Sequence, residues 1–359
     1  MSELKHIVQA ARKQIEAGRP CVLASLMTRS GASYRRPCAR TLISTEGQIT
    51  GLIGGGCLED DLIEDAMEVL ETGQATLVDY DNSTEAALVW GHGLGCAGRV
   101  EILLERLDEN TPGPLPVIAR CFEQRKPLVL ATLFDEAGGG PFRLAQRWLL
   151  DEQHRFVALD RATPEFPDAT PASGELQKIG VHERDGNRWL IEPLLPPFRL
   201  LVFGNGYDVQ PLIRFASELG WDCLIHSQKP APARFREVVT MLDEPASDAF
   251  NDKYIDDRTA VLLMTHHFET DRLWLAQVIP SRAAYIGALG PTKRLQQLLE
   301  GVDNASIPHP LLRGPVGLDI GGDSPEEIAL SIIAEIQMVM HGRDATPLHG
   351  RPDPIHKDG

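Results

Sequence analysis

Three consecutive glycines followed by a cysteine, within residues 51–60 (GLIGGGCLED), are the most constraining feature of this sequence. Gly73 marks the expected end of a helix that begins just after them. Cys57 is therefore expected at a helix start, where backbone N–H groups lack helical partners and the helix dipole favours an anion. The helix is predicted from apolar side chains that recur with helical period, namely Leu58, Leu62, Ile63, Ala66, Met67 and Leu70.

Two interpretations of the Cys57 thiol are open. A helix start lowers a cysteine pKa, although three acidic residues in the first turn oppose that effect. Gly54, Gly55 and Gly56 have no Cβ, so a bulky ligand can lie directly against the loop backbone. The alternative is a tight glycine turn followed by a small buried cysteine, because free cysteine is among the most buried residue types.

Composition limits the classes of protein that the chain can belong to. Its 359 residues predict two or three domains, and 43% apolar with 24% charged residues is ordinary for a globular chain. A net charge of −16 argues against a nucleic-acid-binding surface. The six cysteines include no CxxC pair, which favours reduced thiols in a cytoplasmic protein. No signal peptide and no membrane span are predicted.

The residues before the glycine run predict a small α+β arrangement. A first helix with an apolar face ends at Gly18, and strands are predicted at residues 21–26, 39–44 and 49–53. The loop at residues 28–37 carries Arg35 and Arg36. Adjacent arginines on a loop are commonly solvated surface; beside a glycine-rich turn and a thiol they are suited to clamping a phosphate or carboxylate.

A second glycine-rich motif surrounds another cysteine. Residues 90–98 (WGHGLGCAG) place four glycines around Cys96, and residues 100–104 then predict a strand. The motif repeats the chemistry of the first, because a glycine-rich bend exposes a thiol. His92 also allows a metal site, but two cysteines and one histidine without paired spacing are weak grounds for zinc.

Together the two cysteine motifs resemble the XdhC/CoxI family, the maturation factors of xanthine dehydrogenase-type and carbon monoxide dehydrogenase-type molybdenum enzymes. The matching segments are residues 51–59 (GLIGGGCLE), 93–98 (GLGCAG) and 317–335 (GLDIGGDSPEEIALSIIAE). Weaker matches are Gly204-Asn-Gly206, Thr265-His266 and residues 285–290.

The resemblance implies a chaperone rather than an enzyme. Such a protein binds the molybdenum cofactor, as molybdopterin or its nucleotide form, and protects it during sulfuration by a cysteine desulfurase. It then inserts the cofactor into the large subunit of a molybdenum hydroxylase. Cys57 and Cys96 would lie near the molybdenum or its sulfur ligands, as metal ligands, because thiolates suit soft metal centres. A homo-oligomer is expected, without a defined stoichiometry.

Residues 109–196 are predicted to contain an internal repeat of the first half. Val22-Leu-Ala-Ser-Leu26 aligns with Val129-Leu-Ala-Thr-Leu133, and Arg40 aligns with Arg147 at the same sequence offset. Each copy would be helix, strand, glycine-bearing loop and strand. The second copy has no GGGC equivalent, so it is predicted to be a structural half that completes the sheet.

The C-terminal part has the pattern of a dinucleotide-binding fold. Pro196-Pro197 marks a linker, and a buried strand at residues 198–203 leads through Gly204-Asn-Gly206 into a helix that ends at Gly220. Further strands alternate with helices, which predicts a doubly wound parallel sheet. We therefore expect an N-terminal α+β domain at 1–196, a Rossmann-like domain at 197–345 and a polar mobile tail at 346–359.

Two departures weaken an NAD-binding interpretation of this domain. Val209 occupies the third glycine position of the dinucleotide motif, and the second strand ends in His226-Ser-Gln228 without an acidic residue for a ribose hydroxyl. A two-glycine turn at Gly204 and Gly206 still accepts a phosphate at a helix start. With the family resemblance, this favours a phosphate-bearing pterin or its nucleotide; an NAD(P)-dependent oxidoreductase is the alternative.

Two further candidates come from the C-terminal half. His266 follows a buried strand, at the end where α/β folds bind ligands. Asp319 and its neighbouring glycines precede Ser324-Pro-Glu-Glu327, which predicts a capping box and a helix from Pro325 to about Met340. Ser324 and Glu327 are thereby explained structurally, which leaves His266 and Asp319 as the site candidates.

Overall fold

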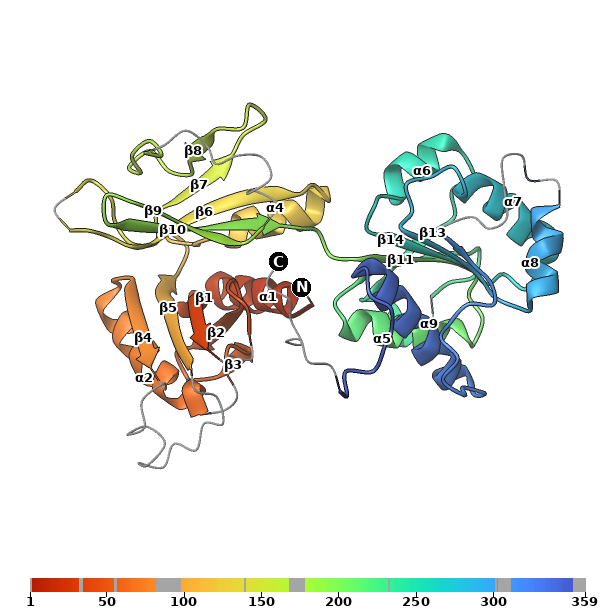
Figure 1. Ribbon diagram of the computed structural model, residues 1–359, viewed down its shortest axis with the longest axis horizontal. Coiled ribbons are helices and arrows are strands. Elements are labelled where there is room, and N and C mark those ends of the chain that lie inside the picture. Colours follow the sequence, from red (N-terminus) through yellow and green to blue (C-terminus); the bar gives the residue numbers. More distant parts are fainter. Residues whose placement is uncertain are drawn as a thin grey trace. The chain divides into compact units, whose positions relative to one another are not determined.

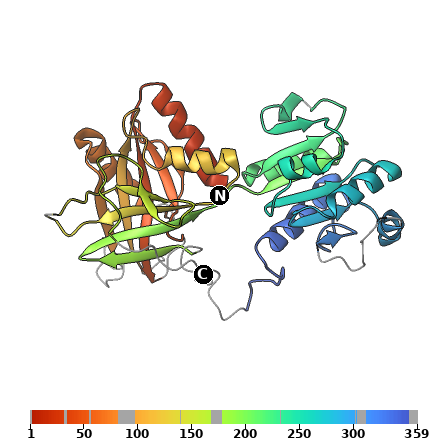
Figure 2. The same ribbon diagram turned by 90° about the horizontal axis from the view of Figure 1, so that it is seen from above.

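The computed structural model describes residues 2–31, 35–54, 57–81, 98–138, 140–167, 178–231, 233–300, 302 and 311–350, without the side chains of Ser2, Cys57 and Arg234. The chain divides into two compact units, Glu3–Pro196 and Pro197–Lys357. Figure 1 labels their elements, and Figure 2 gives a second view of each unit. No helix among these residues is long and apolar enough to cross a membrane.

The N-terminal unit begins each of its halves with a helix, and each half contains five strands. The first half contains α1 (Ser2–Glu16), β1 (Cys21–Gly31), β2 (Arg40–Ser44), β3 (Ile49–Gly51), α2 (Cys57–Thr72), β4 (Thr76–Asp81) and β5 (Gly98–Leu107). The second half contains α4 (Leu115–Gln124), β6 (Leu128–Asp135), β7 (Arg147–Leu150), β8 (Phe156–Ala158), β9 (Gly180–Arg184) and β10 (Asn187–Leu194).

The two halves have the same topology. The first forms an antiparallel sheet in the order β3-β2-β1-β5-β4, and the second forms one in the order β8-β7-β6-β10-β9. The internal repeat is therefore confirmed. The prediction that the second copy completes the first sheet is wrong, because β6 pairs with its own neighbours β7 and β10 and so closes a separate sheet.

The inner faces of the two sheets pack against each other through equivalent residues. Met27 and Leu103 of the first sheet meet Phe134 and Leu190 of the second in one buried cluster. Successive side chains of a strand point to opposite faces, so Ile102, beside Leu103, packs on the outer face under α2. The unit is thus a sandwich of two repeated halves.

Two buried ion pairs cross between the sheets. Arg40 on β2 donates two hydrogen bonds to Glu192 on β10, at 2.8 Å and 2.5 Å. Arg147 on β7 donates to Glu105 on β5 in the equivalent arrangement. All four side chains are at most 8% exposed. Each arginine therefore neutralises an acid of the other half, and these four charges are buried only because the two halves pack together.

A third charged contact joins the sheets nearer their other end. Arg188 on β10 donates to both carboxylate oxygens of Glu101 on β5, at 2.8 Å and 2.7 Å, and also to Asp135. These hydrogen bonds from Arg188 lower the pKa of Glu101. Since the folded pKa lies below the unfolded one, Glu101 stabilises the fold above its unfolded pKa, and this contribution is lost as the pH falls through the folded pKa.

The outer faces of the two sheets are covered differently. α2 covers the first sheet through Leu58, Leu62, Ala66 and Val69, as its predicted apolar face requires. On the second sheet an aromatic cluster takes this place, in which Trp148 and Trp189 are fully buried. The ring contacts in it are mostly edge-to-face, the arrangement that aromatic quadrupoles prefer.

Two predicted strand ends differ from the structure. The loop expected from residue 28 begins only after Gly31, because β1 stays paired with β5 beyond an irregularity between Leu26 and Thr28. The third strand ends at Gly51 rather than at residue 53. Gly51 has φ +97°, and an added Cβ there would lie 2.6 Å from the carbonyl oxygen of Arg40. The strand therefore turns at a position that only glycine fills.

The C-terminal unit is an α/β domain whose strands are all parallel. Its strands are β11 (Arg199–Phe203), β12 (Asp222–His226), β13 (Val239–Leu242), β14 (Thr259–Leu263), β15 (Tyr285–Ala288) and β16 (Leu312–Arg313). Its helices are α5 (Val209–Glu218), η2 (Ala233–Phe235), α6 (Asp248–Tyr254), α7 (Phe268–Val278), α8 (Thr292–Leu299) and α9 (Pro325–Met340). The sheet order is β13-β12-β11-β14-β15-β16, as in a doubly wound fold.

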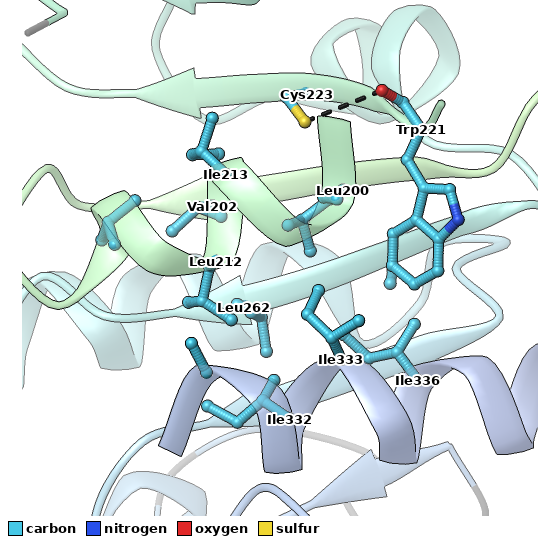
Figure 3. Close-up of a cluster of buried hydrophobic side chains, with 14 of the residues drawn as sticks. Leu200, Val202, Leu212, Ile213, Trp221, Cys223, Leu262, Ile332, Ile333 and Ile336 are labelled. Atoms are coloured by element: carbon cyan, nitrogen blue, oxygen red, sulfur yellow. Dashed lines mark hydrogen bonds between the residues drawn. The ribbon is translucent and has the colours of Figure 1, made fainter. Parts of the chain in front are cut away.

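Helices cover both faces of this sheet, as the near-continuous apolar strands require. α5 and α9 pack on one face, where Val202 and Leu262 meet Leu212 and Ile332 (Figure 3). α6, α7 and α8 pack on the other face, around Phe203. The predicted Rossmann-like sheet and the capping box at the start of α9 are confirmed.

Removal of one partner of a crossed ion pair tests how strongly the two halves depend on each other. Arg40→Met leaves Glu192 buried without a cation, and we expect a loss of about 3–5 kcal/mol of unfolding free energy. The matched control is Arg12→Met, because Arg12 and Glu123 form an exposed pair 3.5 Å apart, whose loss should cost less than about 1 kcal/mol. Calorimetric unfolding measures both, and equal effects would contradict the role assigned to the buried pair.

Candidate functional site

Strand register brings three chain segments to one end of the first sheet. β1 and β5 stay paired up to Gly31 and Gly98, and β4 and β5 up to Asp81 and Arg99. β1 and β3 are both antiparallel to β2, while β1 and β4 are both antiparallel to β5. β1, β3 and β4 therefore run in the same direction. Gly31, Gly51 and Asp81 therefore lie at the same end of the sheet, where Gly98 of β5 also lies.

These segments carry the N-terminal site candidates. Arg35 and Arg36 follow β1, and the glycine run follows β3. α2 begins at Cys57 and runs back along the outer face of the sheet, so its first residue also lies at this end. Several candidates lie outside the described residues, namely Gly55, Gly56, the Cys57 side chain and Cys96 within residues 82–97.

Arg35 holds the chain just before the glycine run. Its Nε donates to the carbonyl oxygen of Leu52 at 3.0 Å, and its guanidinium forms an ion pair with Glu3 on α1. The guanidinium is partly exposed, so it retains a surface towards solvent. Arg36 beside it is exposed. The loop with the two arginines therefore contacts the chain at Leu52, two residues before the first glycine of the run.

Gly54 is packed tightly on the first turn of α2. Its backbone N–H donates to Oε1 of Glu59 at 3.1 Å, so Glu59 reaches back over the helix start. An added Cβ at Gly54 would lie 2.8 Å from Cβ of Leu58 and 3.1 Å from its Cδ2. Gly54 is thus needed for close packing between the loop and the helix. Glu59 is buried, whereas Asp60 and Asp61 are exposed.

A further thiol, not singled out by the sequence, lies in the loop that carries the two arginines. Cys38 is a half-buried residue with φ +72°, and its backbone N–H bonds to the carbonyl oxygen of Leu26. Burial, followed by the carboxylate of Glu192, raises the pKa of Cys38 well above its usual range. The Cys38 thiol therefore stays protonated at neutral pH and is a poor metal ligand or nucleophile.

The described residues contain no preformed metal site. Within those ranges, no three His, Cys, Asp or Glu side chains gather closely enough to hold a metal ion. The two cysteines proposed as metal ligands fall outside the residues whose side chains are described, so their geometry is not part of this statement.

In the C-terminal unit three candidates, Gly204, Gly206 and His266, follow the carboxyl ends of β11 and β14, where the strand order reverses (Figure 1). Ligands of doubly wound folds bind at this edge. Gly204 has φ +123°, and an added Cβ would lie 2.2 Å from the carbonyl oxygen of Met264. The glycine turn after β11 is therefore packed directly against the end of β14, next to His266.

His266 is held in an unusual backbone conformation beside an acid. Its φ is +59°, a region that non-glycine residues adopt at a cost of roughly 1–3 kcal/mol, most often at functional sites. Its Nε2 lies 2.9 Å from Oδ2 of Asp208, at the start of α5. The His266 side chain is 59% exposed, so the imidazole faces solvent over the glycine turn.

A buried carboxylate fixes the turn that contains His266. Asp271 on α7 is 1% exposed and accepts hydrogen bonds from the backbone N–H of Thr265, from the Thr265 hydroxyl and from Arg294. His267 caps α7 by accepting from the N–H of Thr270. Both neighbours of His266 are thus anchored, which stabilises its strained backbone.

Asp319 lies on an exposed loop before α9. The loop is anchored at its start, where Gly317 N–H donates to Glu335 at 2.8 Å and the Ser331 hydroxyl donates to the carbonyl oxygen of Leu318. Among the described residues, no hydrogen bond or ion pair joins Asp319 to the glycine turn or to His266. The structure therefore brings together Gly204, Gly206 and His266, but not Asp319.

The end of β12 lacks the acidic group that a dinucleotide site requires. His226 occupies this position, its Nε2 lies 2.7 Å from the carbonyl oxygen of Glu244, and its ring packs against Phe203 and Trp274. The imidazole is therefore part of the packing of the edge, and it offers no carboxylate to a ribose hydroxyl.

Tight packing at the glycine run can be tested without any ligand. In Gly54→Ala the new Cβ would meet Leu58, so the helix start must shift, and we expect a loss of about 1–3 kcal/mol of unfolding free energy. Gly180→Ala is the matched control, because open space surrounds that glycine. Thermal unfolding compares the two variants, and a Gly54→Ala protein as stable as the control would show that the turn is not close-packed.

Family models match in both units. A model described as the XdhC Rossmann domain matches residues 200–336, and one described as the XdhC and CoxI family matches residues 14–81.

Relatives align over most of the chain. One, from Bacillus subtilis strain 168, is named as a probable subunit of xanthine dehydrogenase; it is 26% identical over 332 residues, which cover 90% of this chain and 94% of that protein. Another, from Escherichia coli K12, is named molybdenum cofactor insertion chaperone PaoD; it is 24% identical over 338 residues, which cover 93% of this chain and 87% of that protein.

A solved structure has the same fold over the full length. It is described as a xanthine dehydrogenase from Bacillus halodurans, with a TM-score of 0.75, 28% sequence identity and 98% of each chain covered. With both units matched by models of one family and with full-length relatives, this chain belongs to the XdhC and CoxI family.

Proposed function

We propose that this protein is a chaperone that binds the molybdenum cofactor, protects it during sulfuration and inserts it into a xanthine dehydrogenase-type molybdenum hydroxylase. The observation that carries the proposal is that β1, β3 and β4 end, and β5 begins, at one end of the first sheet, next in sequence to the two arginines and to both cysteine motifs. Its relative PaoD, named a molybdenum cofactor insertion chaperone, supports the same conclusion. The protein then acts as an accessory factor rather than as an enzyme.

The residues at this end have the chemistry that such a cargo needs. Cys57 and Cys96 are proposed to lie near the molybdenum or its sulfur ligands, because thiolates are the ligands that soft metal centres select. Arg35 and Arg36 supply guanidinium groups that suit a phosphate. Gly54, Gly55 and Gly56 are proposed to offer the cofactor a backbone without side chains.

The C-terminal unit carries a second set of proposed cofactor-binding residues. Gly204, Gly206 and His266 form one surface at the edge where doubly wound folds bind ligands, and we assign Asp319 to the same role as a separate loop contact. The cargo is molybdopterin or its nucleotide form.

The partners follow from this role. The client is the large subunit of a molybdenum hydroxylase, in line with a relative named as a probable xanthine dehydrogenase component. The sulfur donor is a cysteine desulfurase. We further propose a cytoplasmic homo-oligomer that binds neither nucleic acid nor membranes, consistent with the net charge of −16.

Cysteine variants test the cofactor site directly. Protein purified from cells that make the cofactor should contain molybdenum and should show pterin fluorescence. Cys57→Ala should abolish or strongly reduce both, and Cys96→Ala should reduce them less, because only Cys57 stands at a helix start. Neither change should lower the melting temperature, since a cysteine that faces a ligand loses little packing when it is shortened.

Cys21→Ala is the matched control for these variants. Cys21 is fully buried in β1, and burial raises the pKa of its thiol to about 11. This variant should melt at a lower temperature and retain molybdenum. A Cys57→Ala protein that holds as much cofactor as the parent refutes the proposed site. Tight NAD binding by calorimetry, with no molybdenum in the parent protein, would instead favour the oxidoreductase alternative.

Partner binding tests the delivery step. In cells that express all three proteins, affinity purification of this chain should recover the cysteine desulfurase together with the large subunit of the molybdenum hydroxylase. Recovery should fall when cofactor synthesis is blocked, because an empty chaperone has nothing to transfer. If neither partner is recovered from cofactor-producing cells, the delivery role fails even where cofactor is bound.

A further inference from the structure

The carboxylate of Asp208 does not do what its position in the helix predicts. Asp208 is the N-cap residue of α5, where an acidic side chain ordinarily accepts a backbone N–H of the first turn. Its side chain makes no such hydrogen bond, and Oδ2 is instead held by His266 at 2.9 Å. The carboxylate is therefore directed at the glycine turn and not at its own helix.

This carboxylate fills the space beside Gly206. A Cβ added at Gly206 would lie 2.3 Å from Oδ1 of Asp208 and 3.6 Å from Nε2 of His266. In a dinucleotide fold the second glycine lets the pyrophosphate approach this backbone. Here an anion already occupies the approach, and it would repel a phosphate. The absence of a side chain at Gly206 is thus explained by Asp208.

The turn that presents the carboxylate is rigid. Asn205 donates from Nδ2 to the carbonyl oxygens of Lys229 at 3.3 Å and Pro230 at 3.0 Å. Gly204 lies against the carbonyl oxygen of Met264. With His266 fixed on the opposite side, Asp208 is oriented before any ligand binds. Oδ1 has no hydrogen-bond partner among the residues that the structure describes, so it is an acceptor available to a ligand.

The residue before Asp208 in the chain is aromatic. Tyr207, between Gly206 and Asp208, is 88% exposed. A tyrosine with so little burial at a ligand-binding edge offers a face on which a planar ring can stack. The turn thus combines a flat apolar surface with a fixed carboxylate that accepts and cannot donate.

We propose that Asp208 accepts hydrogen bonds from the N–H edge of a 2-amino-4-oxopyrimidine ring that stacks on Tyr207. This inference rests on the proposed function and assigns the heterocyclic end of the cofactor, not its phosphate, to the glycine turn. The 2-amino group and the adjacent ring N–H give two donors on one edge, which suit a carboxylate. A pterin has this edge, and so does the guanine of a nucleotide form.

Paired probes test the assignment on the full-length protein. Pterin and lumazine differ in that lumazine has an oxo group where pterin has the 2-amino group. We expect the wild type to bind pterin roughly 10- to 100-fold more tightly than lumazine by calorimetry, the range for a hydrogen bond to a charged group. If guanosine binds more tightly than pterin, the site is assigned to the nucleotide base. If pterin binds more tightly than guanosine, the site is assigned to the pterin.

Two variants separate the contributions. Asp208→Asn keeps an N-cap side chain of the same shape and should remove the preference for pterin over lumazine. Tyr207→Leu should weaken both rings equally and keep the preference. Unchanged melting temperatures establish that both variants fold.

Three results would overturn the proposal. The first is equal binding of pterin and lumazine, and the second is no binding of either. The third is that pyrophosphate binds the wild type and binds the Asp208→Asn variant still more tightly. Molybdenum content, measured in parallel on protein from cofactor-producing cells, separates this proposal from the chaperone function. If the wild type retains molybdenum but binds pterin and lumazine equally, only the assignment of Asp208 is refuted. A ring preference in protein that never carries molybdenum refutes the chaperone function.

Discussion

The crossed ion pairs between the two sheets are the interaction on which the N-terminal unit depends. Arg40 neutralises Glu192, and Arg147 neutralises Glu105, each across the sandwich. An unpaired charge buried in either half would cost several kcal/mol, so each half needs the other in order to bury its own residues. The repeat is therefore one cooperative body. The end of the sheet at which β3 ends and β5 begins is consequently part of this cooperative body.

Features that depend on local sequence were predicted well. Apolar period predicted α2, and a capping box predicted α9, almost to the residue. The strand, glycine turn and helix at residues 198–220, with the alternation that follows, predicted the parallel sheet. The repeat was visible in the sequence because Arg40 and Arg147 are separated by the same number of residues as the matching strands that precede them. Their partners Glu105 and Glu192 stand at another offset, because the connections between the strands differ in length. Only the structure shows that the two arginine–glutamate pairs are equivalent and that they join two separate sheets.

The same limit applies to the ligand-binding edge of the C-terminal unit. Gly204, Gly206 and His266 follow from their positions after buried strands. Asp208 does not, because an acid at a helix start is ordinary in sequence and usually caps the helix. Its importance comes from a side-chain direction, towards His266 and away from α5. The sequence of this glycine motif suggests a phosphate site, but in the fold the carboxylate of Asp208 lies against the motif. The direction of one side chain therefore decides which ligand group the turn can bind.

The distribution of thiols gives the helix start of α2 its distinct chemistry. Burial keeps Cys21 and Cys38 protonated, so these two thiols do not compete for a soft metal. At the start of α2, Asp60 and Asp61 are exposed and screened by solvent, whereas the buried Glu59 already accepts the N–H of Gly54. A Cys57 thiolate would share this field with one carboxylate. A metal centre bound at this cysteine, as proposed, would supply the compensating charge, and its binding would then be coupled to loss of the thiol proton.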